Sequence, residues 1–276
     1  ILRIKQQYDQ WSHLANHHTR DSRPVIALVD YLESLEHGEA DDFVARLSDA
    51  GFDARLVDVR KLKIEEHDGM PMLADDLGAI DCVWKRAVTG EMLRKPVTGA
   101  FALAQAVSRN LACIIGSFCS WPVATKTFFA LLHDPLARDF LSPEQLEFIE
   151  KHVPKTYLVE NEIDNHRFEK RSHFIAKPTD GYNAIGVIAG SQASDEEWRK
   201  ALAQCPLVVQ EYAPQYATPV IPGKITPEQD AFAFSKANNM LGLFLFDGKF
   251  AGVFPRSGYG PVIGEVEDVV GSRMLY

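Results

Sequence analysis

The sequence predicts an α/β domain followed by a mixed α+β domain. Over the first 119 residues, short apolar segments alternate with segments of helical spacing, which is typical of a parallel sheet with crossover helices. From about residue 156, strand-like and helical segments are mixed. The 276 residues, 46% of them hydrophobic, allow one large core or two domains. We expect a leading helix and linker at 1–23, the α/β domain at 24–119 and the second domain at 120–276.

The first domain is predicted element by element from its periodicity. A leading helix over residues 1–18 has its apolar residues on one side, at Ile1, Ile4, Tyr8, Trp11 and Leu14, and the segment from Asp21 to Pro24 ends it. Strands are then predicted at 25–29, 54–59, 80–84 and 111–115, and helices at 40–50, 98–109 and 122–132.

Helix boundaries are marked by their usual end residues. Gly51 closes the helix at 40–50, and Pro122 lies in the first turn of the helix at 122–132. Ser142 has capping-box spacing to Gln145 and opens a further helix, which Pro154 ends.

A lysine at the end of an apolar strand is the most informative feature of the second domain. Residues 174–176 predict a short buried strand that carries Lys177 to its edge, and Pro178 ends the strand because it lacks a backbone donor. Glycines then allow backbone N–H groups to turn toward anionic oxygens, at Gly181, Gly186 and Gly190. Two interpretations remain open, a nucleotide phosphate site and an ordinary strand-to-turn transition.

A second strand with a polar end follows a helix predicted at 195–204. Residues 206–212 read PLVVQEY and end in Gln210, Glu211 and Tyr212. In a nucleotide site, such a strand end offers backbone groups to an adenine edge and a carboxylate to ribose hydroxyls. The other interpretation is a plain edge strand.

A hairpin is predicted toward the end of the chain. LGLFLFDGKFAGVFPR contains two apolar strands joined by Asp247 and Gly248, a dipeptide suited to a type I′ turn. Arg256 would lie at the far end of this hairpin. It is either a solvated loop charge or a bidentate partner for a carboxylate or phosphate.

Composition argues against nucleic-acid and membrane partners. The net charge is −9 and the pI is near 5.5, and the longest basic cluster, at Arg60, Lys61 and Lys63, is too short to follow a phosphate backbone. Apolar runs are far shorter than the roughly 20 residues that cross a bilayer, and no signal-peptide pattern opens the chain.

The four cysteines favour reduced thiols in a cytoplasmic protein. They form no C-x-x-C pair and have no histidine at zinc spacing. Cys82, Cys113 and Cys205 accompany apolar segments, where cysteine behaves as a small hydrophobe. Cys119 lies in a loop of small residues, and a catalytic role for it needs a base that the sequence does not identify.

In their order and spacing, FIAKPTDGYNAIGV, VVQEYAP and FLFDGKFAGVFPRSG resemble the ATP-grasp superfamily. The resemblance is to its circularly permuted branch, with glutathionylspermidine synthase-like and eukaryotic glutathione synthetase-like ligases. VIALVDYLES, GFDARLVDV, an acidic turn and AIDCVWKRAV look like the Rossmann-like pre-ATP-grasp domain of that branch, at 24–119. The ATP-grasp domain, with its lid and central sheet, would then occupy 120–276, and IIGSFCSWPVATKTFFALLHD would bring Lys126 to the nucleotide at a helix start.

The resemblance implies an ATP-dependent carboxylate–amine ligase that acts through an acylphosphate on small-molecule carboxylates and amines, with ATP and Mg²⁺ as cofactors. Lys126 and Lys177 would hold phosphates, and Asp180 would bind Mg²⁺ or serve as an Asx-type turn residue. The remaining roles implied are loop closure by Gly181, Asn183 and Gly186, adenine and ribose binding by Gln210, Glu211 and Tyr212, and acyl-phosphate or carboxylate contacts by Arg86 and Arg256. A lone arginine at a strand end, such as Arg86, is otherwise a surface charge.

Two departures from the branch keep an alternative open. A Glu-x-Asn strand that binds magnesium usually precedes the first strand, and none precedes Val25; it either lies outside this sequence or is lacking. The loop has Asn183, Ala184 and Ile185 where glycines are common. The alternative is a non-catalytic ATP-grasp-like protein that binds a nucleotide or peptide. A Rossmann oxidoreductase is disfavoured because VDYLESLEHGE contains no G-x-G-x-x-G. Substrate identities and oligomeric state stay open.

Overall fold

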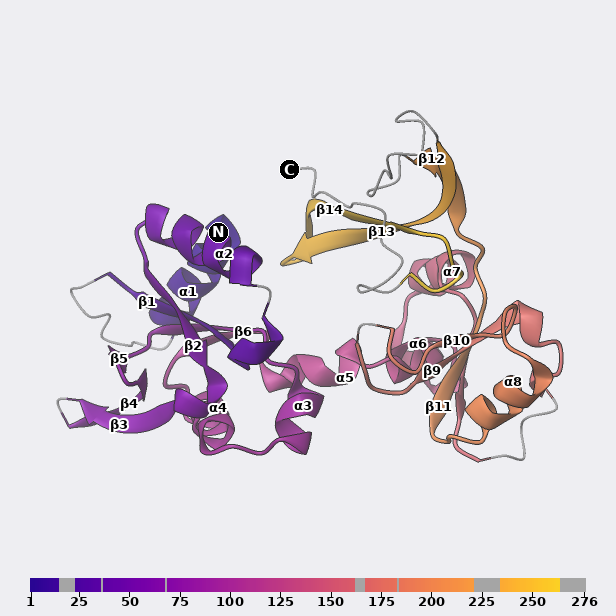
Figure 1. Cartoon of the computed structure of the whole chain (residues 1–276). Coiled ribbons are helices and arrows are strands. Elements are labelled where there is room, and N and C mark those ends of the chain that lie inside the picture. The colour runs from indigo at the N-terminus through magenta and orange to yellow at the C-terminus, as the bar shows by residue number, and fades with distance from the viewer. Residues whose placement is uncertain are drawn as a thin grey trace. The chain divides into compact units, whose positions relative to one another are not determined.

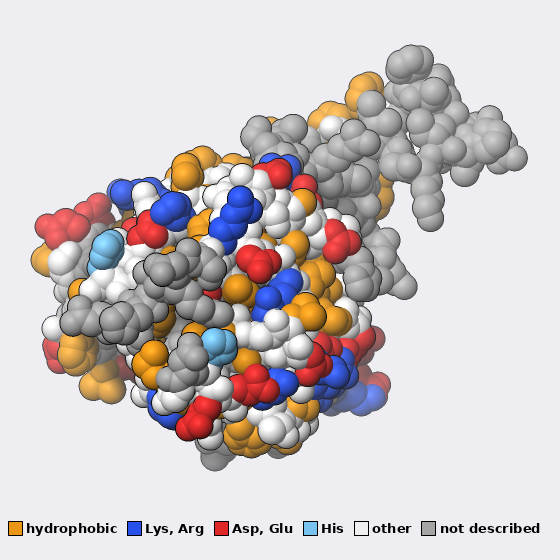
Figure 2. Space-filling view, turned by 90° about the vertical axis from the view of Figure 1, so that its left-hand side faces the viewer, with side chains coloured by type: hydrophobic (Ala, Val, Ile, Leu, Met, Phe, Trp, Pro, Cys, Tyr) orange, Lys and Arg blue, Asp and Glu red, His pale blue; other side chains and the backbone are white. Residues whose placement is uncertain are grey.

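The computed structural model describes residues 1–14, 23–35, 37–67, 69–161, 167–182, 184–220 and 234–263 (Figure 1). The chain forms two compact units, Ile1–Trp121 and Pro122–Tyr276. Within the described residues, no helix combines the length and apolar character needed to cross a membrane. Acidic and basic side chains are interspersed on the face drawn in Figure 2.

The N-terminal unit is built on a four-stranded parallel sheet, which confirms the predicted α/β class. Its strands are β1 (Val25–Asp30), β2 (Asp53–Asp58), β6 (Cys82–Lys85) and β7 (Cys113–Ile115), in the order β2-β1-β6-β7. Every pair of neighbours is parallel. The strands are short and apolar because both faces of such a sheet are covered.

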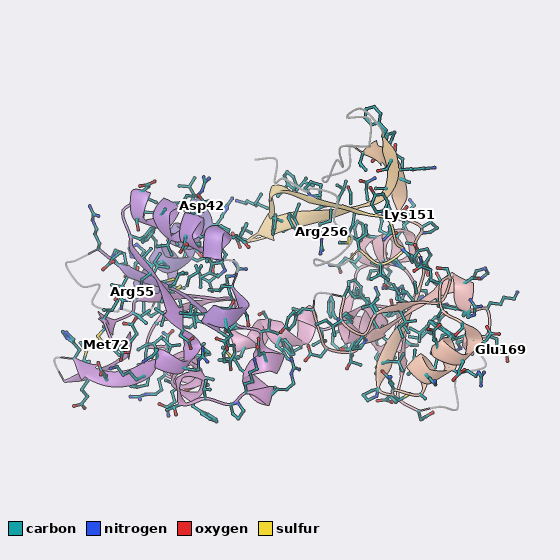
Figure 3. All side chains as sticks on the ribbon, viewed as in Figure 1. Asp42, Arg55, Met72, Lys151, Glu169 and Arg256 are labelled. Carbon is teal, nitrogen blue, oxygen red and sulfur yellow. The ribbon has the colours of Figure 1, made fainter. Side chains whose placement is uncertain are left out.

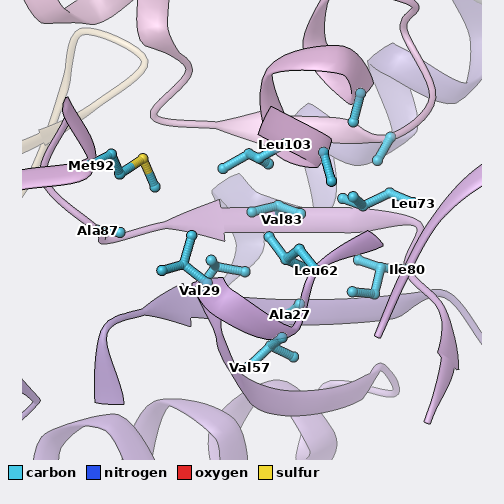
Figure 4. Packing of buried hydrophobic residues seen from close by; sticks show 14 of the residues in the cluster. Ala27, Val29, Val57, Leu62, Leu73, Ile80, Val83, Ala87, Met92 and Leu103 are labelled. Atoms are coloured by element: carbon cyan, nitrogen blue, oxygen red, sulfur yellow. The ribbon is translucent and has the colours of Figure 1, made fainter. Parts of the chain in front are cut away.

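Helices cover both faces of this sheet. Along β1, Ala27 and Val29 pack into one cluster with Leu103 of α4 (Thr98–Ser108). Ile26 and Leu28 pack into another with Leu47 of α2 (His37–Asp49). Figure 4 shows the first cluster from close by. Burying each large side chain of this kind stabilises the fold by roughly 1.5–3 kcal/mol. The helices of this unit are α1 (Leu2–Leu14), α2 (His37–Asp49), α3 (Thr89–Arg94) and α4 (Thr98–Ser108).

A small antiparallel sheet replaces the acidic turn expected between residues 60 and 80. It consists of β3 (Lys63–His67), β4 (Met70–Asp75) and β5 (Gly78–Ala79). Arg55 of β2 fixes it by donating two hydrogen bonds to the Asp75 carboxylate, at 3.1 and 2.8 Å. Because charged residues in these strands are held by ion pairs, a search for apolar segments does not predict the strands.

The C-terminal unit contains a second, antiparallel four-stranded sheet. Its strands are β8 (Thr156–Val159), β9 (Phe174–Pro178), β10 (Ile188–Ala189) and β11 (Leu207–Glu211), in the order β10-β9-β11-β8. Helix α8 (Asp195–Leu202) covers one face through Trp198 and Leu202, which pack with Val209 of β11. Ser194 and Glu197 form a capping box at the start of α8.

The helix predicted over 122–132 is wrong as a single element. The structure has α5 (Trp121–Ala124) and α6 (Thr127–Leu132), and Thr125 and Lys126 interrupt the helix. The backbone N–H of Lys126 donates to the Thr179 carbonyl at 3.1 Å instead of to a carbonyl of the preceding turn. The predicted capping box is confirmed at α7 (Pro143–His152), where Ser142 and Gln145 cap each other.

A three-stranded antiparallel sheet contains the predicted hairpin. It is formed by β12 (Tyr216–Val220), β13 (Ser235–Phe246) and β14 (Lys249–Gly258). Asp247 and Gly248 both have positive φ, 53° and 68°, as a type I′ turn requires, so this prediction is confirmed.

The described residues also include several short 3₁₀ helices. The four cysteines form no disulfide within the described structure. Cys82 and Cys113 are buried, and Cys119 is exposed. The 3₁₀ helices span Leu32–Ser34, Val59–Lys61, Phe118–Ser120, Pro135–Phe140 and Arg171–His173.

Candidate functional site

Lys177 and Gln210 project from the same face of the antiparallel β8–β11 sheet. β9 and β11 are direct neighbours, with Lys177 opposite Val208. Successive residues of a strand point to opposite faces. Ala176 and Val209 pack on the α8 side, so Lys177 and Gln210 lie on the face that α8 leaves uncovered.

A chain of hydrogen bonds fixes the Lys177 ammonium. Lys177 Nζ donates to Gln210 Oε1 at 2.6 Å, and Gln210 Nε2 donates to Thr156 Oγ1 at 2.8 Å. Thr156 Oγ1 in turn donates to the Pro154 carbonyl at 2.8 Å. Gln210 is 8% exposed and Thr156 3% exposed. The chain therefore orients the amide oxygen of Gln210 toward the ammonium.

Lys126 reaches the loop that follows β9 from the start of α6. Its backbone N–H binds the Thr179 carbonyl, and its Nζ donates to the Gly181 carbonyl at 2.7 Å. The interruption between α5 and α6 makes both contacts possible, because residue 126 sits at the N-cap position rather than inside a helix. Lys126 and the loop thus form one bonded substructure.

The two lysines create a positively charged and partly desolvated site. Burial lowers the pKa of the Lys177 ammonium, and the nearby charge of Lys126 lowers that pKa further. Burial also lowers the pKa of Lys126, while the Asp180 carboxylate partly offsets this effect. The hydrogen-bond partner of Lys177 is a neutral amide, so the charge of Lys177 is oriented without being neutralised by that contact. An anion placed here would stabilise both ammonium groups.

The loop after β9 depends on backbone conformations that glycine adopts easily. Gly181 and Gly186 have φ values of 146° and 71°. A Cβ on Gly186 would lie 2.8 Å from Cγ of Pro178, so a side chain at this position would push the loop away from β9. Ala184 has φ of 57° without being glycine. Asn183, predicted to contact the cofactor, lies outside the described residues.

The three residues predicted to bind adenine and ribose, at the end of β11, lie in different surroundings. The Gln210 side chain is buried against Lys177, whereas Glu211 is exposed. The backbone N–H of Glu211 donates to the Lys155 carbonyl, and that of Tyr212 donates to the His173 carbonyl, each at 2.8 Å. The hydroxyl of Tyr212 lies 3.3 Å from Gln215 Oε1. The Glu211 carboxylate is therefore an exposed group at this strand end.

The two arginines predicted to act in catalysis lie in different units. Arg86 follows β6 of the N-terminal unit, where its Nη1 lies 3.3 Å from Oε1 of Glu39. Arg256 lies on β14 opposite Met240, and Figure 3 labels its position. Its guanidinium is 5.4 Å from the centre of the Phe254 ring, and its Nε is buried without a hydrogen-bond partner among the described residues.

Asp180, predicted as a magnesium ligand, lies in the loop beside Lys126. Across the ranges that the structure describes, no group of three or more His, Cys, Asp and Glu residues is arranged to hold a metal ion. The sequence thus brings Lys126, Lys177, Asp180, Gly181 and Gly186 to one loop, with Gln210 on the neighbouring strand.

Thr156 is a contributor that sequence reasoning missed. It lies 54 residues before Gln210 and meets it only because β8 pairs with β11. Thr156 also lines a cavity of about 810 Å³ bounded mainly by α5, α6 and β8. Lys126 and Lys177 do not line this cavity. The cavity therefore adjoins the Lys177–Gln210–Thr156 hydrogen bonds at Thr156, but it is not where the two ammonium groups lie.

Comparison with known proteins identifies similar folds only among solved structures. No family model matches the sequence, and no curated protein matches it. The similar solved structures include ATP-grasp ligases. At 9–16% identity and TM-scores below 0.5, they describe a likeness of backbone arrangement and transfer no residue role.

Three of these structures illustrate the range. The D-cycloserine synthetase DcsG has a TM-score of 0.47 and 16% identity, over 91% of this chain and 75% of that one. The ATP-grasp ligase PsnB with a minimal precursor has a TM-score of 0.45 and 12% identity, over 87% and 77%. A gamma-glutamylcysteine synthetase-like protein from Methylobacillus flagellatus KT has a TM-score of 0.49 and 9% identity, over 99% and 72%.

Proposed function

We propose that this chain binds ATP in the manner of the ATP-grasp superfamily and belongs to an ATP-dependent carboxylate–amine ligase. The observation that carries the proposal is the meeting of two partly buried lysines at one loop. Lys126 arrives from a helix start and Lys177 from a strand, and both ammonium groups are held in place by neutral oxygen atoms. An enzyme that uses a polyanionic cofactor requires this kind of oriented positive charge.

The phosphates would lie against the Lys177 face of the β8–β11 sheet. Lys126 and Lys177 would each contact phosphate oxygens, and the backbone N–H groups of the loop around Gly181 and Gly186 would point toward them. Asp180 offers a hard oxygen ligand, and Mg²⁺ in nucleotide sites takes one or two carboxylates together with phosphate oxygens and water. Bound there, Mg²⁺ would offset the negative charge of the phosphates. The exposed Glu211 carboxylate would accept hydrogen bonds from ribose hydroxyls.

The ligase chemistry would proceed in two balanced steps. The terminal phosphoryl group of ATP passes to a substrate carboxylate, which gives an acylphosphate and ADP. An amine then attacks the acyl carbon, the amide bond forms as the bond between the acyl carbon and the phosphate oxygen breaks, and inorganic phosphate leaves together with the proton that the amine loses. This chain would contribute positioning, charge neutralisation and exclusion of water. Arg256, whose buried Nε has no hydrogen-bond partner within the described ranges, is the residue of this unit that we propose for the acyl-phosphate oxygens.

The domain assignment is part of the same proposal. We assign residues 24–119 to a Rossmann-like pre-ATP-grasp domain and 120–276 to the ATP-grasp domain of the circularly permuted branch. Helices cover both faces of the parallel sheet, which supports the first assignment. The antiparallel sheet with its lysine, glycine loop and neighbouring glutamine supports the second.

A non-catalytic nucleotide- or peptide-binding protein is the second candidate. Ala184 favours it, because a residue with a side chain at φ 57° costs about 1–2 kcal/mol and restricts close approach of the loop to phosphate. Both candidates predict that ATP binds. They differ in whether a carboxylate and an amine together stimulate its turnover.

The test is release of ADP and phosphate by the chain across a panel of carboxylates and amines, with products identified by mass spectrometry. A ligase should release phosphate only when both substrates are present, in amounts equal to the amide formed. If ATP binds but no carboxylate and amine together stimulate its turnover, the result would support the non-catalytic binding protein. The Lys177→Ala variant provides the background rate.

A further inference from the structure

An edge strand of the C-terminal unit lies along a cavity that the proposed phosphate site does not use. In the sheet order β10-β9-β11-β8, β8 is the last strand, and among the described strands only β11 pairs with it. The cavity is the one of about 810 Å³ that β8, α5 and α6 bound. Its volume lies in the roughly 300–1,000 Å³ range of ligand sites. We call it the β8-edge cavity.

The register of β8 shows where its backbone groups point. The Glu211 N–H donates to the Lys155 carbonyl at 2.8 Å, one pair beyond the β8–β11 ladder and in the same register. Hydrogen-bonded and non-hydrogen-bonded pairs alternate along antiparallel strands. The backbone N–H and carbonyl groups of Thr156 and Leu158 therefore point away from β11, and within the described residues no hydrogen bond reaches these four groups. Thr156, Tyr157 and Leu158 all line the cavity, so it lies beside this open edge rather than over one face of the sheet.

Two features of the β8-edge cavity suit an extended peptide. First, unpaired N–H and carbonyl groups of an edge strand can pair with an extended chain, which then becomes an added strand. Second, two large apolar side chains that line the cavity are left uncovered, since Leu158 is 42% exposed and Leu131 is 51% exposed. Residues directly opposite each other on neighbouring strands point to the same face. The peptide residue opposite Leu158 would therefore bury an apolar side chain against it.

The direction of the added strand follows from the sheet. Every pair of neighbours in this sheet is antiparallel, and antiparallel pairing is slightly the more stable kind. β8 ends at Val159, whose partner Leu207 pairs in turn with Pro178. The carbonyl of the next residue, Thr179, binds the backbone N–H of Lys126. An antiparallel peptide would therefore place its N-terminus at the end of the sheet where the loop with the two lysines lies.

Glu160 provides an acceptor for that N-terminus. It follows β8 directly, lines the cavity and is exposed. Arg167 also lines the cavity, but its guanidinium lies 5.1 Å from the centre of the Tyr157 ring, and no ion pair joins it to Glu160 among the described residues. A peptide ammonium beside Glu160 would form a charge-assisted hydrogen bond, which an acetylated N-terminus cannot form.

We propose that the β8-edge cavity binds a short extended peptide as a strand antiparallel to β8, with its N-terminal ammonium at Glu160. The inference rests on the proposed function only in naming this peptide as the amine substrate of the ligase. The ammonium would first lose a proton to water, and the amine would then displace phosphate from the acylphosphate as described above. Peptide binding itself requires no nucleotide, so the two proposals can fail separately.

The test is calorimetric titration of the chain, without nucleotide, against a panel of pentapeptide amides composed of Ala, Leu, Thr and Val. The amide end avoids placing a carboxylate near Asp134, which also lines the cavity. The best binder is then methylated at each backbone nitrogen in turn. Because alternate N–H groups of an added strand point to β8, methylation should weaken binding at least tenfold at every second residue and far less at the residues between. Acetylation of the N-terminus should weaken binding at least fivefold.

Variants of the chain test the same contacts from the other side. Leu158→Pro removes the outward N–H without touching a bond to β11, and proline is tolerated at such edge positions. It should bind the peptide at least tenfold more weakly than Leu158→Ala, which keeps that N–H, and should bind Mg·ATP as the parent does. Glu160→Gln should bind the free and acetylated peptides equally. Glu196→Gln, which alters an exposed pair with Lys200, should discriminate between them as the parent does.

Four results would overturn the inference. They are a folded parent that binds no peptide of the panel, methylation effects without a two-residue period, an acetylated peptide that binds as well as the free one, and equal binding by Leu158→Pro and Leu158→Ala. Self-association of the parent that Leu158→Pro abolishes would assign the edge to a second copy of the chain instead. Because the methylated peptides are tested on the parent, a variant that fails to fold does not remove the test. Peptide binding without Mg·ATP binding would support the cavity and contradict the proposed ligase.

Discussion

Lys177 Nζ donates a 2.6 Å hydrogen bond to Oε1 of Gln210 across two neighbouring antiparallel strands. The contact sets the direction of a partly buried positive charge without neutralising it, since its acceptor is an amide. Thr156 holds the other end of that amide. A charge oriented in this way is prepared for an anionic ligand, and it also makes the empty site sensitive to substitution and to pH.

Replacement of Gln210 should destabilise the empty protein. Gln210→Met removes the acceptor of Lys177 and leaves an ammonium that is partly desolvated without that partner. We expect a loss of about 1–3 kcal/mol in the free energy of unfolding, measured by urea denaturation. Gln204→Met, at an exposed position in the same unit, should be close to neutral. Equal effects of the two substitutions would show that the Lys177–Gln210 bond does not contribute.

The contribution of Lys177 to the stability of the empty protein should rise with pH on approaching the ordinary lysine range. The pKa of Lys177 is lowered by burial and by Lys126 from its ordinary 10.5. Between its folded-state value and 10.5, the unfolded chain binds more protons than the folded chain, so increasing pH favours folding. Urea unfolding across this window should show a smaller rise for Lys177→Met than for the parent. Lys200→Met, which changes an exposed pair with Glu196, should keep the full rise; identical slopes in all three proteins would refute the pKa shift.

An alanine at Gly186 should displace the loop from β9. The new Cβ would lie 2.8 Å from Cγ of Pro178. The alanine would also have to adopt a φ of 71°, which costs a residue with a side chain about 1–2 kcal/mol. We expect lower stability together with weaker Mg·ATP binding, measured by denaturation and calorimetry. Gly38→Ala serves as a control, because its Cβ would meet no atom within 4 Å. Unchanged nucleotide affinity in Gly186→Ala would show that this loop is not part of the nucleotide site.

The sequence predicts the elements with strong local signals and misses those that depend on distant partners. The apolar run at Val25–Val29 and the Asp247–Gly248 turn are recovered because burial and positive φ restrict the residue types there. The strands β3 to β5 are missed because charged residues such as Asp75 find partners outside them, here Arg55 of β2. Likewise, the break at Lys126 arises from its bond to Thr179, 53 residues later in the chain, which no local pattern encodes.

The candidate site shows the same division. Lys177 and the glycines of its loop stand out in the sequence because a strand, a cation and flexible backbone follow one another. Thr156 does not stand out, because a threonine in an apolar segment is common and its role depends on the pairing of β8 with β11.

The most direct test of the account is calorimetric titration of Mg·ATP into the parent, Lys177→Ala and Lys200→Ala. Lys177 is held at the proposed phosphate site, whereas Lys200 forms an exposed pair with Glu196 on α8. We predict that the parent and Lys200→Ala bind equally and that Lys177→Ala binds at least tenfold more weakly, which corresponds to about 1.4 kcal/mol. Equal affinity of Lys177→Ala and the parent, or no binding by a folded parent, would contradict the assignment of this face as a nucleotide site.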